Sequence, residues 1–142
     1  MRFMMIVKAS KESEAGAMPT KELVAAMGKF NEEMIRAGVM LSGEGLHPSS
    51  KGARVAYSGQ KRTVTDGPFS QTGELIAGFW VINAKSKDEA LDWAKRVPFT
   101  NGEVVEVRQI FETSDFPPEI LPPDAAAREE AWREAQQQKG AS

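Results

Sequence analysis

The sequence predicts a single domain of the α+β class, and three observations support that prediction. Residues 3–7 and 75–83 are apolar at almost every position, as expected of buried strands. Residues 19–37 and 86–97 carry helix signals in their apolar spacing and their end residues. The predicted order is strand, helix, strand, inserted hairpin, strand, helix, strand, which is the order of a ferredoxin-like βαββαβ sandwich with an inserted β-hairpin. A chain of 142 residues with 41% hydrophobic content is long enough for one such domain.

The N-terminal half of this fold begins with a strand and a helix. Both alternating sets of side chains in residues 3–7 are apolar, which predicts a strand covered on both faces. Residues 19–37 predict an amphipathic helix, with Pro19 in its first turn and Gly38 at its C-terminal cap. The apolar residues of this helix form one stripe, made of Leu23, Val24, Met27, Phe30, Met34 and Ile35.

The middle of the chain predicts a strand, a hairpin and the central strand of the sheet. Residues 39–47 are expected to form a strand that contains two glycines and ends at a Pro-Ser-Ser turn. Residues 53–57 and 62–65 flank turn residues at 58–60, which predicts a hairpin. Residues 75–83 are apolar in both alternating sets, so this segment is expected at the centre of the sheet.

The C-terminal part of the domain predicts one more helix and one more strand. Ser86 followed by Glu89 forms a capping-box signature, and Pro98 ends the helix that starts there. Residues 104–111 are expected to be the last strand.

The composition changes after Phe116. The Pro-rich segment PPEILPPD precedes residues 125–142, which are charged, rich in alanine and expected to be helical. We therefore expect a domain over residues 1–114 and a linker with a helical tail over residues 115–142. The tail carries six acidic and three basic residues, against 14 acidic and 15 basic residues in the domain. Strapping of a dimer and solvation as a disordered segment are its two expected roles.

The predicted sheet has more apolar surface than two helices can cover. Two helices cover one face of a four-stranded sheet, yet the first and central strands are apolar on both faces. A second copy stacked sheet to sheet would bury the other face, so the sequence predicts a homodimer of the dimeric α+β barrel kind.

Composition excludes several classes of function. The formal net charge is -2, which gives no general attraction to nucleic acid or to an anionic membrane. The apolar run at the N-terminus is too short for a signal peptide or a membrane span, so we expect a cytoplasmic protein. There is no cysteine and only one histidine, and no phosphate-binding loop, HExxH or G-x-S-x-G motif. We therefore expect no metal and no cofactor.

Two candidate catalytic residues are His47 and Asp66. His47 is the one side chain whose ordinary pKa lies near neutrality, and it follows a predicted strand. Asp66 opens the segment TDGPF, where Asp-Gly favours a turn. If the two side chains met, the carboxylate would orient the imidazole as a base-orienting partner. The alternatives are a surface histidine in a loop and an aspartate that caps the turn.

The other candidates are an acid, two arginines and an aromatic residue. Glu44 lies between two glycines and is expected to point to the sheet face away from the helices, or else to be a strand-edge acid in water. Arg54 and Arg108 could hold an anionic ligand or form surface ion pairs. Trp80 could line an apolar pocket or pack in the core.

A longer stretch of the sequence resembles a known family. The run VTDGPFSQTGELIAGFWVINAKSKDEALDWAKRVP, with GEGLHPSS before it and VVEVRQIFE after it, resembles the DGPF branch of the YCII-related family over about residues 1–112. The resemblance implies a ferredoxin-like dimeric α+β barrel. It also implies a small cleft served by a His and Asp pair, as in the wider family. A related member acts as a dehydrochlorinase in chlorinated-aromatic breakdown.

The resemblance transfers to particular residues. Asp66 matches the aspartate of the DGPF motif, and Glu44 matches the acid of the G-E-G-L motif. The family histidine lies in an earlier helix, whereas the helix predicted over residues 19–37 has none. Some members of this branch also look associated with extracytoplasmic sigma factors, which implies an accessory role in regulation.

The sequence therefore leaves three classes of function open, of which the last is a structural subunit with no small-molecule site. In the first, Glu44, His47, Asp66 and Trp80 line a cleft at the sheet face that binds a small organic molecule and catalyses cofactor-free elimination or isomerisation. In the second, the same cleft or the tail serves a non-catalytic ligand-sensing or protein-interaction module. A closed pocket with buried acids beside His47 would favour the enzyme, and a shallow cleft with both acids exposed would favour the module.

Overall fold

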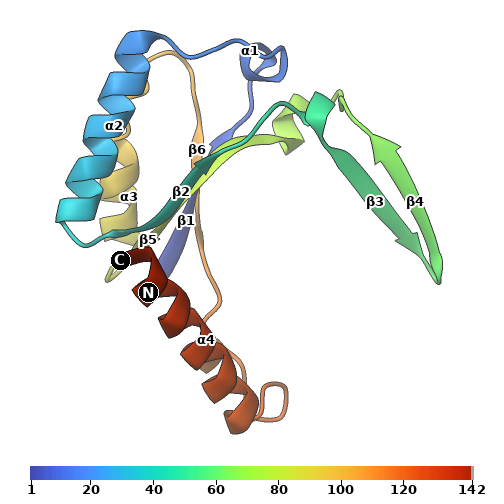
Figure 1. Cartoon of the computed structure of the whole chain (residues 1–142), viewed down its shortest axis with the longest axis vertical. Coiled ribbons are helices and arrows are strands. Elements are labelled where there is room, and N and C mark those ends of the chain that lie inside the picture. Colours follow the sequence, from blue (N-terminus) through green and yellow to red (C-terminus); the bar gives the residue numbers. More distant parts are fainter. Residues whose placement is uncertain (142) are drawn as a thin grey trace.

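The protein, described over residues 1–141 in a computed structural model, has the predicted α+β architecture (Figure 1). Ser142, the last residue of the predicted tail helix, lies outside the described residues. Four antiparallel strands form one sheet in the order β2-β5-β1-β6, so the predicted central strand does lie between two neighbours. The strands of this sheet are β1 (Arg2–Lys8), β2 (Met40–Gly45), β5 (Ile76–Asn83) and β6 (Val105–Gln109).

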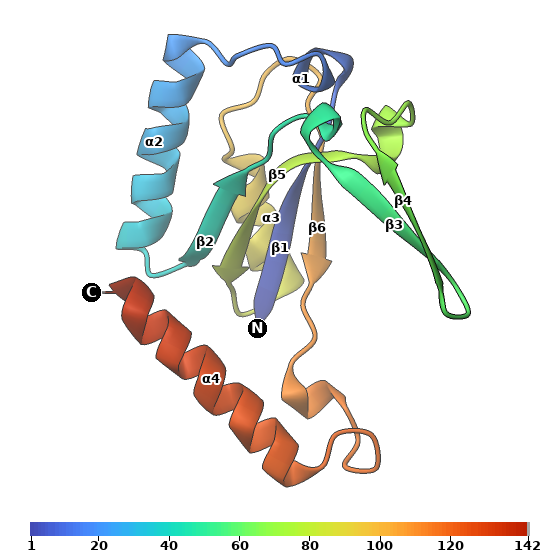
Figure 2. The same ribbon diagram turned by 45° about the vertical axis from the view of Figure 1, so that its right-hand side comes forward.

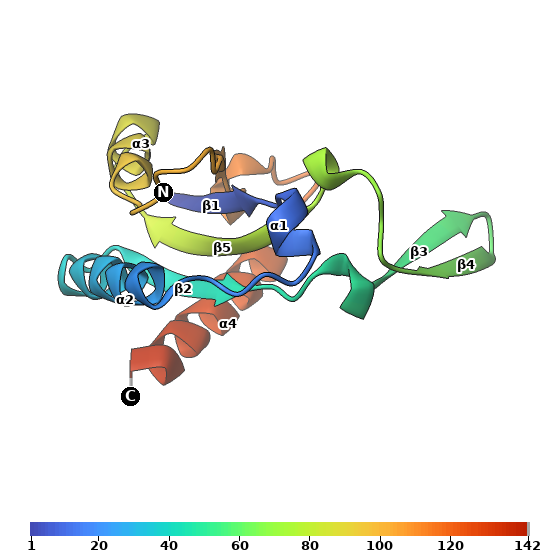
Figure 3. The same ribbon diagram turned by 90° about the horizontal axis from the view of Figure 1, so that it is seen from above.

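Two helices, α2 (Lys21–Arg36) and α3 (Lys87–Lys95), lie on the same face of the sheet (Figures 1 and 3). Thr20 caps α2, because its hydroxyl accepts a hydrogen bond from the Leu23 amide at 3.1 Å. Pro19 therefore precedes the cap and is outside the first turn, where the sequence predicts it. Gly38 follows the C-terminal end in the left-handed region, with φ at +71°.

The start of α3 differs slightly from the predicted capping box. The Ser86 hydroxyl accepts a hydrogen bond from the Glu89 amide at 3.1 Å, as expected. The Glu89 carboxylate reaches back to the amide of Lys85, also at 3.1 Å, one residue before the cap. Both bonds fix the point at which the chain turns from β5 into α3.

The core lies between the helices and one face of the sheet. Phe3 and Met5 of β1 alternate inward, and Phe30 of α2 packs against Trp80 of β5 with ring centroids 5.7 Å apart in an edge-to-face arrangement. Trp93 of α3 contacts the same Phe30 ring at 6.4 Å. The buried apolar residues that form the core are Phe3, Met5, Phe30, Met34, Val39, Trp80, Ile82, Ala84, Ala90 and Val97.

The opposite face of the sheet is apolar at its centre, and α2 and α3 do not cover it (Figure 3). Met4 of β1 pairs with Val81 of β5, and Ile6 pairs with Phe79. All four side chains alternate with core residues and are only partly buried. We call this surface the open face.

The predicted hairpin forms an arm that projects from the sheet on the side away from α2 and α3 (Figures 1 and 3). Its strands are β3 (Ala53–Ser58) and β4 (Lys61–Asp66), joined at Gly59, whose φ is +59°, and Gln60. Every residue of both strands is exposed.

The tail forms a separate helix at the other end of the sheet, where β1 begins and β6 ends (Figure 2). The chain passes through a short turn of helix, η3 (Thr113–Asp115), before α4 (Pro123–Ala141). Within the described residues, no helix is both long enough and apolar enough to span a bilayer. Three more short elements were not predicted, namely α1 (Lys11–Glu14), η1 (Ser49–Lys51) and η2 (Thr72–Glu74).

Candidate functional site

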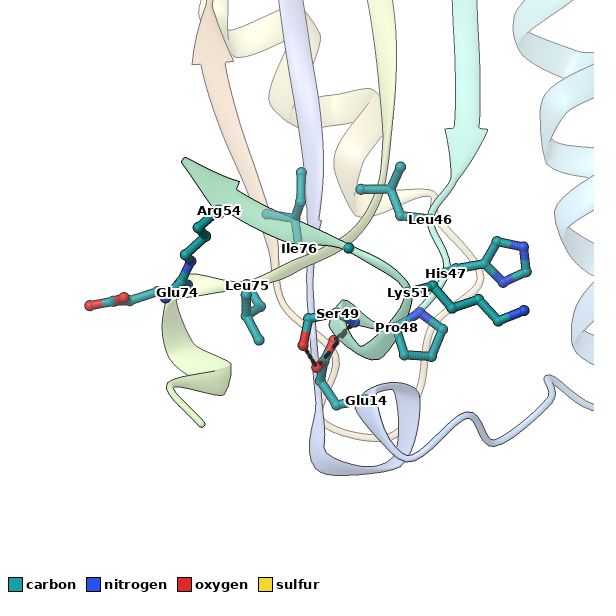
Figure 4. Close-up of a pocket in the computed structure, with 11 residues that line it drawn as sticks. Glu14, Leu46, His47, Pro48, Ser49, Lys51, Arg54, Glu74, Leu75 and Ile76 are labelled. Atoms are coloured by element: carbon teal, nitrogen blue, oxygen red, sulfur yellow. Dashed lines mark hydrogen bonds between the residues drawn. The ribbon is translucent and has the colours of Figure 1, made fainter. Parts of the chain in front are cut away.

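An open hollow of about 480 Å³ lies where β2 ends, β5 begins and the arm leaves the sheet (Figure 4). This volume is within the range usual for small-molecule sites. Eleven residues line it, contributed by α1, the β2–β3 connection, the base of the arm and the start of β5. They are Glu14, Leu46, His47, Pro48, Ser49, Lys51, Gly52, Arg54, Glu74, Leu75 and Ile76.

The lining has an apolar middle and polar ends. Figure 4 shows the side chains of Leu46, Leu75 and Ile76 between His47 and Lys51 on one side and Arg54 and Glu74 on the other. An apolar surface with a few convergent polar groups is the usual composition of a ligand site. The arrangement suits a molecule with an apolar body and a polar group at an end.

Ser49 ties three segments of the chain together at the base of the hollow. Its hydroxyl donates to the Glu14 carboxylate, and its amide donates to the same carboxylate at 3.1 and 3.3 Å (Figure 4). The same hydroxyl accepts a hydrogen bond from the Phe69 amide at 3.0 Å. The segment DGPF, residues 66–69, is thereby fixed against η1.

Two further contacts hold this segment in place. The Gly67 amide donates to the Gly52 carbonyl at 2.9 Å, and a Cβ atom on Gly67 would lie 1.8 Å from the Ser49 carbonyl oxygen. The Arg54 guanidinium lies over the Phe69 ring, 3.9 Å from its centroid. The DGPF segment itself does not line the hollow, but it contacts three residues that do, namely Ser49, Gly52 and Arg54.

Of the residues that the sequence singled out, His47 and Arg54 are the two that line the hollow. His47 is exposed, and neither of its ring nitrogens has a hydrogen-bond partner within residues 1–141. Arg54 has no ion-pair partner within the same residues, so its donors are open to a ligand.

The other four candidates lie elsewhere. Glu44 is exposed on the open face, opposite Phe79 of β5. Asp66 is exposed at the end of β4, and within residues 1–141 no hydrogen bond joins it to His47. Arg108 is on β6 and forms an ion pair with Glu106 at 3.3 Å.

Trp80 lies in the core and does not line the hollow. It is 7% exposed, and its indole Nε1 donates to the Asn31 side-chain oxygen at 2.9 Å. The reason is the alternation of β5, which puts Trp80 on the same face as the buried Ile82 while Phe79 and Val81 face the open side. The structure of a single chain therefore does not bring Glu44, His47, Asp66 and Trp80 together around one cleft.

Four polar residues of the hollow were missed from the sequence, namely Glu14, Ser49, Lys51 and Glu74. Glu14 and Ser49 are 35 residues apart, and no periodic pattern links them. Within residues 1–141, no group of three or more His, Cys, Asp or Glu side chains is close enough to hold a metal ion.

Comparison with known proteins now adds the family. The family model described as YCII-related domain matches residues 1–114 of the chain. The protein belongs to the YCII-related family. An uncharacterised protein of Rhizobium meliloti (strain 1021) is 34% identical over 92 residues, which is 65% of this chain and 69% of that relative. The resemblance found in the sequence is thus confirmed at the level of the family.

The hollow lies within the part of the chain that the family model matches. All eleven lining residues of this YCII-related protein fall between residues 1 and 114. The tail helix α4 follows that stretch.

Proposed function

We propose that this YCII-related protein binds a small organic molecule in the hollow beside His47. The observation that supports the proposal is the grouping of His47, Lys51 and Arg54 around the apolar side chains of Leu46, Leu75 and Ile76. The open donors of Arg54 favour a ligand that carries a carboxylate on an apolar body.

The exposure of the two acids favours binding without catalysis. Glu44 and Asp66 are both exposed, and neither lines the hollow, which is open to solvent. A ligand-sensing module, accessory to regulation, is therefore our leading interpretation.

Acid-base catalysis is the second candidate, and one observation favours it. His47 lies in the wall of the hollow with both ring nitrogens unpaired within the described residues, so its imidazole is free to accept a proton from a bound ligand. Cofactor-free elimination or isomerisation would need only such a base and an anion holder. Asp66 and Glu44 do not line the hollow. They could take part in this chemistry only if their segments moved toward it, or if a second copy of the chain placed its own Asp66 or Glu44 beside it.

We further propose that two copies stack their open faces to form a homodimer. The partly buried Met4, Ile6, Phe79 and Val81 give each copy an apolar surface for this contact. A cytoplasmic location and the absence of direct nucleic-acid or membrane binding stay predictions.

A thermal-shift screen tests ligand binding without knowledge of the reaction. Small aromatic acids, other carboxylates, phenols and lactones are added to wild type and to the His47→Ala, Arg54→Gln and Arg108→Gln variants. We expect an aromatic acid to raise the melting temperature of wild type and of Arg108→Gln, because binding stabilises the folded state by mass action. The rise should be lost in His47→Ala and in Arg54→Gln.

Two outcomes would contradict the proposal. One is that no compound of the panel raises the melting temperature. The other is that a compound does so equally in all four proteins, which would place its site away from the hollow. If a ligand is found, incubating it with wild type separates the two classes of function, because an enzyme converts it and a sensing module leaves it unchanged. Asp66→Asn then tests whether Asp66 takes part in any turnover.

A further inference from the structure

We propose that the arm of each copy packs against the tail of the other copy in the homodimer. The inference rests on the dimer proposed above and adds a second, reciprocal contact to it. The arm is residues 53–66. The name tail cluster is used for four exposed apolar side chains in the chain that follows β6, namely Phe111, Phe116, Ile120 and Trp132.

One face of the arm is apolar and has no partner within the described chain. Strand pairing sets Val55 opposite Val64, Tyr57 opposite Arg62 and Ala53 opposite Asp66, so four apolar or aromatic side chains share one face with one base and one acid. The other face carries Arg54, Thr65, Ala56, Thr63, Ser58 and Lys61. Tyr57 is 71% exposed and Val64 is 65% exposed. Because an isolated two-stranded hairpin is marginally stable in water, a surface that covers this face would stabilise the arm.

The tail cluster offers a surface of matching chemistry. The Phe111 and Phe116 rings contact each other with centroids 5.1 Å apart, and Phe111 is nevertheless 69% exposed. Trp132 on α4 is 63% exposed. Exposed aromatic side chains are enriched at the centres of protein interfaces.

The two segments also have opposite net charge, with Arg62 and Asp66 on the apolar face of the arm and Arg54 and Lys61 on its other face. The arm carries Arg54, Lys61 and Arg62 against the single acid Asp66. Residues 115–142 carry six acidic and three basic residues. Contact between the basic arm and the acidic tail is therefore electrostatically complementary, whereas arm against arm or tail against tail would repel.

The positions of the arm and the tail cluster determine how the two-fold axis of the dimer must run for them to meet. The arm leaves the sheet between β2 and β5 at one end, and the tail leaves β6 at the other end (Figure 2). When open faces stack about a two-fold axis perpendicular to the strands, the arm end of each copy lies beside the tail end of the other. The two-fold axis then repeats the contact between arm and tail, so that it occurs twice in one dimer and leaves neither surface free for a third copy. An axis parallel to the strands would instead place arm beside arm.

Site-specific cross-linking tests this contact, because the chain has no cysteine of its own. Tyr57→Cys and Trp132→Cys chains that differ in a purification tag are co-expressed and treated with a short bis-maleimide. We expect a covalent product that contains both tags. Ser58→Cys paired with Trp132→Cys is the matched control, since residue 58 is on the opposite face of the same arm, and it should give much less product. Val64→Cys paired with Ile120→Cys repeats the test with other side chains.

The outcomes separate the failure of this contact from the failure of the dimer or of ligand binding. Sedimentation of wild type as a monomer would overturn both the dimer and the contact. A dimer in which neither cysteine pair cross-links would overturn the contact alone, and so would a product between two Tyr57→Cys chains. A chain carrying both substitutions that links only within itself would also overturn it. The thermal-shift screen reads ligand binding independently of all these results.

Discussion

Gly67 is the residue at which a single methyl group should have the clearest effect. A Cβ atom there would lie 1.8 Å from the Ser49 carbonyl oxygen, so Gly67→Ala must push the DGPF segment away from η1. We expect the free energy of unfolding to fall by about 1–3 kcal/mol, as for other overpacked sites. The change should also weaken binding of any ligand of the hollow. Chemical denaturation monitored by tryptophan fluorescence measures the first effect.

Gly73→Ala is the matched control for that variant. It lies in the same connection between β4 and β5, and a Cβ atom there would meet nothing within 4 Å. If the two variants unfolded at the same denaturant concentration, the close contact between Gly67 and Ser49 would not be a feature of the folded protein.

For single residues, the sequence identified some of the side chains with suitable chemistry, but it did not predict which of them lie together in the fold. His47 and Arg54 were chosen for their chemistry, and both line the hollow. Glu14 and Ser49 were not found, because a hydrogen bond between residues 35 positions apart leaves no local pattern. The face taken by Trp80 depends on which side of the sheet the helices cover, and alternation alone does not specify that side.

Among the elements, the long ones were predictable and the short ones were not. α2 extends over 16 residues, which is enough to show a helical period, whereas β1 and β5 have seven and eight residues and were predicted as strands from short, continuously apolar runs. The elements α1, η1 and η2 have three or four residues, too few for any period to be detected. Each of these three missed elements contributes at least one residue to the hollow, which is why the sequence did not reveal its outline.

The tail helix supports a prediction about the domain. Among the residues whose burial the structure describes, all the buried apolar core residues lie between Phe3 and Val97, and none of them belongs to α4. We therefore expect a chain that ends at residue 114 to fold, with native circular dichroism and a cooperative unfolding transition. Trp80 and Trp93 remain in that chain as fluorescence reporters of the core.

The oligomeric state of the shortened chain is a separate measurement. Loss of the tail should weaken the dimer if the arm binds the tail of the other copy. A shortened chain that lacks cooperative unfolding at any protein concentration would contradict a domain boundary at residue 114.

In the whole molecule, the open face, the arm and the hollow all lie away from α2 and α3. The open face supplies an apolar surface, the arm extends from the same side, and the hollow lies where arm and sheet meet (Figures 1 and 4). The helices α2 and α3 and the core hold this arrangement and contribute no residue to the hollow. The proposed ligand site and the proposed dimer interface would therefore lie next to each other in this protein.

The most direct test of ligand binding beside His47 is the NMR signal of its imidazole. His47 is the only histidine of the chain, so the Cε1–Hε1 signal of tag-free protein needs no further assignment. Addition of the aromatic acid that most raises the melting temperature should shift this signal saturably in wild type, and the shift should be lost in Arg54→Gln. An acid that stabilises the protein and shifts amide signals elsewhere, while the His47 signal stays unchanged at saturation, would contradict a binding site in the hollow.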